Sequence, residues 1–164
     1  MYREELAFDE GRRLYSVAAV VLLRRGSPLL GQSPPAPTAE SLKPVEMYVD
    51  TGSNISSITE EVAMRIGLNP AILPTARVGG LGGFSHQAVS TQIDLAVAGR
   101  MISLDKVSIL SPFHEKVKSG KGVYKREGTM EHPPINLFGL DALAKLRARL
   151  IVVSDQRHGW LEID

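Results

Sequence analysis

The segment "MYVDTGSNISSIT", residues 47–59, joins a strand pattern to a run of small hydroxyl and amide residues around a single carboxylate. Val45, Met47 and Val49 alternate with polar or aromatic residues, and this period of two predicts a half-buried strand that ends at Asp50. A carboxylate placed there costs free energy unless it is paired, hydrogen-bonded or used in chemistry. Asp50 is therefore the first candidate for a functional residue.

The motif Asp50-Thr51-Gly52-Ser53 has a chemical and a structural interpretation. A tight loop can hold the carboxylate charge with backbone N–H groups and hydroxyls, and Gly52 lets another backbone approach closely. Asp-x-Gly turns are also common, and an Asp at the end of a strand can cap its own loop. On these letters alone the structural interpretation is favoured, because so short a motif often occurs by chance.

Length and composition favour one domain over residues 1–164. This length is enough for a single hydrophobic core, and 19 Lys and Arg against 18 Asp and Glu give a net charge of +1. So balanced a charge does not predict binding to nucleic acid or to an anionic membrane. The absence of cysteine excludes disulfides, thiolate nucleophiles and Cys-based metal sites.

No membrane span or signal peptide is expected. The longest apolar run, residues 17–23, is far shorter than the roughly 20 residues that a transmembrane helix needs. Acidic residues precede this run where a signal peptide would be basic. We therefore expect a soluble cytoplasmic protein.

Strand patterns outnumber helix patterns along the chain. Beside the strand at 45–49, they cover residues 15–23, 89–97, 101–110 and 148–154, and the stretches just before Gly139 and after Gly159. Gly99-Arg100 is expected to turn the chain between the second and third of these runs. Many short strands between Gly and Pro turns are typical of a β-barrel or a sandwich. Residues 24–43 and 111–134 have little periodicity and are expected to be exposed loops.

Two short helices are expected. The first has a capping-box pattern at Ser57 and Glu60, apolar residues every four positions from Ile58, and a stop at Gly67 and Pro70. The second follows Gly139 and carries Leu140, Leu143 and Leu146.

Two further motifs contain glycine. In "VGGLGGF", residues 78–84, four glycines surround Leu81 before a strong strand pattern, which indicates a mobile hairpin tip or simply a flexible turn. It does not fit a phosphate-binding loop, because a strand rather than a helix follows. In "INLFGLDALAKL", residues 135–146, Gly139 permits close contact between a strand and a helix, and Asp141 suits the first helical turn.

The other polar residues do not predict a metal or nucleic-acid site. The four histidines at 86, 114, 132 and 158 are scattered without ligand spacing, so neither a metal nor an organic cofactor is expected. The basic residues between 116 and 126 are diluted by nearby Glu and lack interleaved aromatics, which favours a solvated loop.

Three motifs occur in a fixed order along the chain: a strand that ends in Asp-Thr-Gly-Ser, a Gly-Gly-x-Gly-Gly-Phe tip, and a late helix start of the form apolar-apolar-Gly-x-Asp. In this order they resemble the retropepsins, the retroviral-type aspartic proteases and their cellular relatives. The resemblance covers residues 44–163, apart from the loop 111–134. It implies an acid-protease fold, all-β in class: a closed β-barrel lobe, mainly β with two short helices, that pairs with an identical lobe. Because the chain has one Asp-Thr-Gly, a two-fold homodimer is expected to complete the active site.

The resemblance also implies the site residues. Two Asp50 carboxylates, one from each subunit, would share a proton, activate a water and hydrolyse a peptide bond of a polypeptide substrate. Thr51 would lock the two loops across the dimer axis, and Gly52 would let the substrate lie close. The implied substrate-binding residues are Ser53, Asn54, Ile55 and the flap residues Gly79, Gly80, Leu81, Gly82, Gly83 and Phe84.

Departures from the viral pattern accompany this resemblance. Leu140 and Asn54 replace an Arg and an Asp that pair in viral members, so the chain is more similar to cellular relatives. Ser53 stands where many viral enzymes have Ala, and its hydroxyl is expected to donate to Asp50 and favour the charged carboxylate. The end of the chain, residues 158–164, is expected to offer an exposed edge strand to a second subunit, or else Trp160 packs within its own subunit.

Two alternatives differ in function class. One is a catalytically silent or self-processing binding and dimerisation module with the same fold; its relatives usually degrade the Asp-Thr-Gly or the flap motif, and both are intact here. The other is an unrelated β-barrel with accidental motifs, which a monomeric chain would favour.

Overall fold

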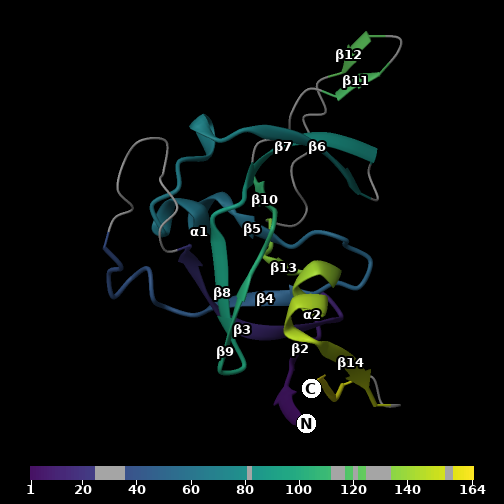
Figure 1. Ribbon diagram of the computed structural model, residues 1–164. Helices are drawn as coiled ribbons and strands as arrows, with labels where there is room; N and C mark the ends of the chain where they lie inside the picture. Colours follow the sequence, from purple (N-terminus) through teal and green to yellow (C-terminus); the bar gives the residue numbers. More distant parts are fainter. Residues whose placement is uncertain (25–35, 81–82, 112–116, 120–121, 125–133, 154–156) are drawn as a thin grey trace.

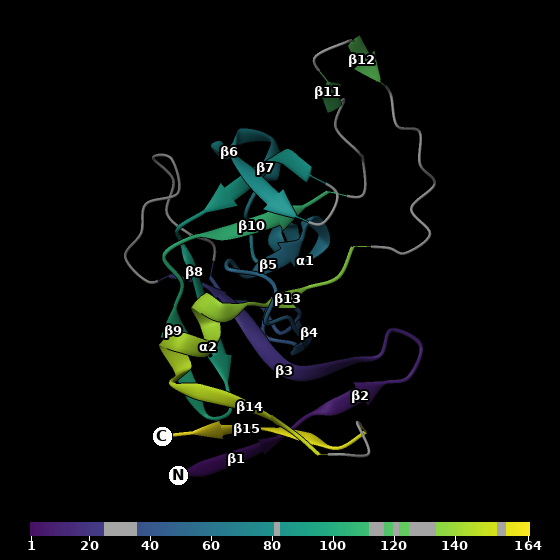
Figure 2. The same cartoon turned by 90° about the vertical axis from the view of Figure 1, so that its right-hand side faces the viewer.

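The structure is a computed structural model that describes residues 1–24, 36–80, 83–111, 117–119, 122–124, 134–153 and 157–164. Within these residues the fold is mostly β, with two short α-helices and a short 3-10 helix. The strands form a large sheet, a small sheet and a separate hairpin (Figures 1 and 2). The predicted mainly-β class with two short helices is confirmed.

The large sheet has ten strands in the order β6-β7-β10-β5-β13-β4-β3-β8-β9, with β2 paired to β3 outside this path. They are β2 (Ala7–Asp9), β3 (Leu14–Leu23), β4 (Val45–Val49), β5 (Ser57–Thr59), β6 (Thr75–Gly80), β7 (Gly83–Ser90), β8 (Ile93–Val97), β9 (Arg100–Ser103), β10 (Val107–Leu110) and β13 (Leu137–Phe138). Among the described residues the hydrogen-bonded path ends at β6 and β9. The sheet is therefore open, and its closure into a barrel stays a prediction.

Parallel pairing brings the ends of β4 and β13 together. β13 runs parallel to β4 with Phe138 opposite Val49, and it also meets β5 with Leu137 opposite Ser57. Since parallel neighbours end at the same edge of a sheet, the segments that follow β4 and β13 leave it side by side. These segments are the Asp50 loop and the start of the second helix.

The small sheet joins the two ends of the chain. Its order is β1-β15-β14, with β1 (Tyr2–Glu5), β15 (Gly159–Ile163) and β14 (Ala148–Val152) all antiparallel, and Figure 2 shows the N- and C-termini beside each other. The terminal strand was expected to have an exposed edge, but both edges of β15 are paired within the chain. Trp160 packs in its own subunit, with the Arg3 guanidinium 4.8 Å from its ring centroid.

The first helix begins later than the sequence predicts. Ser57 and Ile58 belong to β5, and α1 (Glu60–Arg65) has Thr59 as its N-cap, whose side chain accepts a hydrogen bond from the Val62 N–H. Strand pairing overrides the capping-box pattern, because Ile58 is fully buried and lies opposite Ile109 in the parallel ladder. The 3-10 helix η1 covers Pro70–Ile72, and α2 covers Leu140–Leu146 as predicted.

The predicted long hairpin after residue 88 is divided into four strands. β7 ends at Ser90 and β8 begins at Ile93, so the strand predicted at 89–97 is interrupted. The turn uses Ala98 and Gly99, both with positive φ, while Arg100 already belongs to β9. β10 leaves β9 and pairs with β7 and β5, and three of its four residues, Val107 to Ile109, are buried there.

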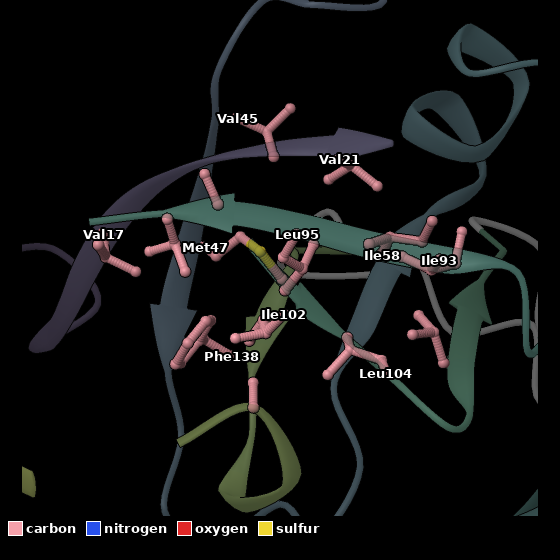
Figure 3. Close-up of a cluster of buried hydrophobic side chains, with 14 of the residues drawn as sticks. Val17, Val21, Val45, Met47, Ile58, Ile93, Leu95, Ile102, Leu104 and Phe138 are labelled. Carbon is pink, nitrogen blue, oxygen red and sulfur yellow. The ribbon is translucent and has the colours of Figure 1, made fainter. Parts of the chain in front are cut away.

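One hydrophobic core lies against the large sheet. Figure 3 shows its buried side chains, which come from β3, β4, β5, β8, β9 and β13 and include Val21, Met47, Ile58, Leu95 and Phe138. Each large apolar side chain buried in this way contributes about 1.5–3 kcal/mol. α2 adds Leu143 and Leu146 to the core, whereas Leu140, predicted to share their role, is 41% exposed.

The two predicted loops are described in part. Residues 25–35 lie outside the described residues, and residues 36–44 contain a turn in which the Thr38 and Ser41 side chains each accept a hydrogen bond from the other's backbone. Within the predicted loop 111–134, β11 (Val117–Ser119) and β12 (Gly122–Tyr124) form a hairpin. In the part of the chain that the structure describes, no helix has the length and apolar character to cross a bilayer.

Candidate active site

Asp50 follows the last residue of β4 and is fixed by the neighbouring strand. Its backbone N–H donates to the Phe138 carbonyl at 3.1 Å, and the Tyr48 N–H donates to the Asn136 carbonyl at 2.9 Å. The N–H groups of Tyr48 and Asp50 thus both bond to the segment 136–138, so the strand hydrogen-bonding pattern continues through Asp50. The sequence prediction of a strand that delivers Asp50 is confirmed.

The Asp50 carboxylate is half buried and is held by its own loop. Oδ1 accepts a hydrogen bond from the Gly52 N–H at 2.9 Å, and the Asp50 carbonyl accepts one from the Ser53 N–H at 3.2 Å. No further hydrogen bond or ion pair to this carboxylate occurs within the described residues. One oxygen is therefore open in the described part of the chain, where no cation neutralises the carboxylate.

The neighbouring loop residues differ in what they contact. The Ser53 hydroxyl donates to the Ile55 carbonyl at 2.7 Å, so the prediction that it donates to Asp50 is wrong. The Ile55 carbonyl is only two residues along the loop from Ser53, and serine hydroxyls commonly bond to backbone groups at such a short separation. Thr51 and Asn54 are exposed and Ile55 is half buried. The exposed Thr51 is free to meet another molecule.

A hydrogen-bond network that the sequence did not reveal supports this loop from the side of α2. The Leu140 N–H donates to the Ser53 carbonyl at 2.8 Å, and the Gly139 N–H donates to Ser56 Oγ at 3.0 Å. Ser56 in turn donates to Asp141 Oδ1 through its hydroxyl at 2.6 Å and its N–H at 2.9 Å. The sequence predicts Asp141 as a first-turn acid and as the last residue of the Gly-x-Asp motif, but it does not predict the bonds to Ser56. The signal available was a hydroxyl six residues after Asp50 and an acid two residues after Gly139.

Gly139 is required by close backbone contact. A Cβ atom at this position would lie 2.9 Å from the Ser53 carbonyl oxygen, 3.0 Å from the Ile55 carbonyl carbon and 3.0 Å from the Ser56 nitrogen. All three atoms belong to backbone that cannot move without disturbing the Asp50 loop. The predicted close contact at Gly139 is confirmed, and its partner is this loop.

The predicted flap is the hairpin of β6 and β7. Gly79 lies opposite Phe84, and Gly80 lies opposite Gly83, whereas Leu81 and Gly82 fall outside the described residues. The hairpin lies at the end of the molecule opposite the termini, as both ribbon views show (Figures 1 and 2). It belongs to the same sheet as Asp50, because β10, β5 and β13 connect β7 to β4.

A charged cluster lies beside β4 on the β2–β3 hairpin. The Tyr48 hydroxyl donates to Asp9 Oδ2 at 2.8 Å and to Glu46 Oε2 at 3.0 Å, and Arg12 Nη1 lies 2.9 Å from the same Asp9 oxygen. The Arg12 N–H, then the Tyr48 hydroxyl and the Arg12 guanidinium, lower the pKa of Asp9 to about 2. Burial, then the bonds to Asp9 and Glu46, raise the pKa of Tyr48 to about 12.

Metal-ligand groupings are not found in the described part of the chain, where no three His, Asp or Glu side chains come together. The chemistry that the site offers is that of a carboxylate on a rigid glycine-containing loop. Such a group exchanges protons with water and with bound substrate.

Comparison with known proteins agrees with this geometry. The family model for "Aspartyl protease" matches residues 38–141, which include the Asp50 loop, the β6–β7 hairpin and the start of α2. No curated protein matches the sequence. Among solved structures, the chain is similar to a retropepsin-like aspartic protease from Rickettsia conorii, with a TM-score of 0.59 and 16% identity over 98% of this chain and 89% of that chain.

The matched segment is more than half of the chain, and the structural likeness extends over nearly all of it. At 16% identity this likeness describes the fold, while the family model describes the sequence motifs. Together they support a protease function in general. The chain belongs to the aspartyl protease family and has a retropepsin-like fold.

Proposed function

We propose that this protein is an aspartic endopeptidase in which Asp50 of each subunit of a homodimer acts on one peptide bond. The observation that carries the proposal is the Asp50 carboxylate, half buried and bonded only by the Gly52 N–H within the described residues. One such carboxylate per chain is half of a catalytic pair. An identical subunit related by a two-fold axis supplies the other half, since isologous contacts repeat each residue.

The reaction needs one proton shared between the two carboxylates. Two carboxylates held close together do not both ionise, so one is charged and the other carries the proton. The charged Asp50 takes a proton from water as the water oxygen bonds to the substrate carbonyl carbon, and the protonated one donates to the carbonyl oxygen. The C–N bond then breaks as the Asp50 that took the water proton gives it to the leaving amine, and the other Asp50 takes a proton back from the diol. No metal or organic cofactor has a role in these steps.

The remaining site residues are proposed to position the substrate. Thr51 is exposed beside Asp50, where its hydroxyl is available to the partner loop, and Gly52 leaves room for the substrate backbone. Ser53, Asn54 and Ile55 border the path of the substrate. The β6–β7 hairpin is proposed to cover an extended peptide, which main-chain hydrogen bonds would hold as an added strand.

The test is cleavage of a mixed peptide library at several pH values by the wild type and by Asp50→Asn, with product ends read by mass spectrometry. Asn keeps an oxygen that accepts the Gly52 N–H, so the variant is expected to fold and dimerise while cleavage falls by at least about 1000-fold. Circular dichroism and sedimentation provide the control for folding and assembly. Cleavage that persists in Asp50→Asn, or no cleavage by a dimeric wild type, would reject the proposal and favour the binding module.

A further inference from the structure

The strand register places two serines, Ser57 and Ser108, on the sheet face that carries Asp50. Tyr48 lies opposite Leu137, Leu137 lies opposite Ser57, and Ser57 lies opposite Ser108. Directly paired residues project to the same face of a sheet, and so do residues two positions apart in one strand. Asp50, Leu137, Ser57 and Ser108 therefore share one face.

The other face of the same strands is the hydrophobic core. Val49, Phe138, Ile58 and Ile109 alternate with the residues of the Asp50 face and all belong to the core cluster. Tyr48 is buried but lies outside this cluster. The Asp50 face is thus separate from the core. On β5 and β10 it carries the hydroxyls of Ser57 and Ser108, whereas the following residues, Ile58 and Ile109, face the core.

Ser57 is the unusual member of this pair. It is 3% exposed, and its hydroxyl has no hydrogen-bond partner among the described residues. Ser108, also buried, contacts the Gln87 side chain on β7, the strand that continues into the β6–β7 hairpin. Buried hydroxyls without partners are rare in native proteins, and each one calls for an explanation, for example a role in the chemistry of a site.

The position of Ser57 is within reach of a bound peptide. β13 separates β5 from β4, so Ser57 is about 10 Å, or two strand spacings, from the strand that delivers Asp50. An extended peptide advances about 3.3 Å per residue, so a side chain within about three residues of the cleaved bond can reach it.

We infer that Ser57 is a specificity-determining residue that selects a neutral hydrogen-bonding substrate side chain, namely Ser, Thr, Asn or Gln, near the cleaved bond. This inference rests on the proposed function and adds its substrate class. An aliphatic side chain would leave the Ser57 hydroxyl unpaired, and a charged one would be desolvated against the neutral groups of Ser57, Ser108 and Gln87. A neutral polar side chain both donates to and accepts from a hydroxyl.

Four proteins test the inference: the wild type, Ser57→Ala, Ser57→Thr and Ser90→Ala. Ser90 provides the matched control, because it is equally buried on β7 but lies opposite the core residue Val107 and accepts a bond from the Gln92 N–H. In the peptide library, the wild type is expected to prefer a neutral polar residue at one position by about 10-fold or more in kcat/KM over its aliphatic counterpart. Ser57→Ala is expected to lose this preference, while Ser57→Thr and Ser90→Ala keep it.

A binding measurement separates this inference from the proposed function. The same peptides are titrated against Asp50→Asn dimers with and without Ser57→Ala. If the wild type cleaves but Ser57→Ala keeps its preference, the inference is wrong and the proposed function stands. If the wild type does not cleave but the binding preference of the Asp50→Asn dimers depends on Ser57, Ser57 selects a bound side chain and the proposed function is wrong.

Thermal unfolding adds a readout that a structural role would change. A hydroxyl without a partner in the chain contributes no bond to folding, so Ser57→Ala is expected to unfold at the same temperature as the wild type or higher. A clearly lower unfolding temperature would mean that the Ser57 hydroxyl is bonded within the protein, which would overturn the inference.

Discussion

At the scale of single residues, the Asp50 carboxylate is held by one backbone N–H and by no cation of its own chain within the described residues. A carboxylate that keeps an open oxygen in this way can exchange protons with water and with a bound substrate. The proposed catalytic role is our answer to the question that the sequence raised at Asp50.

Gly139 offers a test of how tightly the Asp50 loop is packed. Gly139→Ala would place Cβ within 3.0 Å of the backbone of residues 53–56, so the loop or α2 must shift. We expect a loss of about 1–3 kcal/mol in the free energy of unfolding, measured by urea denaturation, together with reduced cleavage.

Gly11→Ala serves as the control for this substitution. The new Cβ would meet one side-chain atom, Asp9 Oδ1, at 3.3 Å rather than three backbone atoms near 3.0 Å, so a smaller loss of stability than in Gly139→Ala is expected. Equal stability losses in the two variants would show that Gly139 has no special packing role.

The residue-level predictions failed where hydrogen bonds depend on tertiary structure. The sequence points to Asp50 and Gly139 because each stands in a short motif: Asp50 ends a strand pattern, and Gly139 lies where a strand meets a helix. The bond from Ser53 to Ile55 and the bonds from Ser56 to Asp141 depend on how the loop folds against α2, and spacing along the chain does not reveal them.

At the scale of elements, local pattern located most strands but misplaced their ends. The capping-box pattern predicted a helix from Ser57, whereas pairing with β10 and β13 makes residues 57–59 a strand. β1 and β2 were not predicted, because their short and charged sequences carry little alternation and are held by β15 and β3. Tertiary pairing thus decided the cases in which local propensity was weak.

The Asp9 cluster ties the β2–β3 hairpin to β4 and makes a pH prediction. Asp9 has its pKa lowered to about 2 from 3.8, so its contribution to stability is present above pH 4 and is lost as the pH falls through 2. Tyr48 has its pKa raised to about 12 from 10.0, so its contribution is present below pH 10 and is lost as the pH rises through 12.

Urea unfolding at pH 2, 3 and 4 tests the acid side of this prediction. The free energy of unfolding is expected to fall less steeply in Asp9→Asn than in the wild type, because Asn has no charge to lose. Glu61→Gln, an exposed residue in the first turn of α1, is the control and is expected to follow the wild type. Parallel curves for the wild type and Asp9→Asn would show that the cluster does not link protonation to folding.

At the scale of the whole molecule, the order of strands was beyond the reach of the sequence. The motifs indicated a retropepsin-like lobe, but the parallel pairs β4–β13 and β5–β10 join segments far apart in the chain. The terminal strand β15 is paired on both sides by β1 and β14, so a second subunit must contact other edges or exchange one of these strands.

The most direct measurement of the central claim is a subunit-mixing titration. Wild type at fixed concentration is mixed with increasing amounts of Asp50→Asn, allowed to exchange subunits, and assayed for peptide cleavage. If each active site needs Asp50 from both subunits, activity falls progressively toward zero as inactive mixed dimers replace wild-type dimers. If cleavage stays constant in the presence of excess Asp50→Asn while mixed dimers are detected by mass, one subunit suffices and the two-carboxylate account is contradicted.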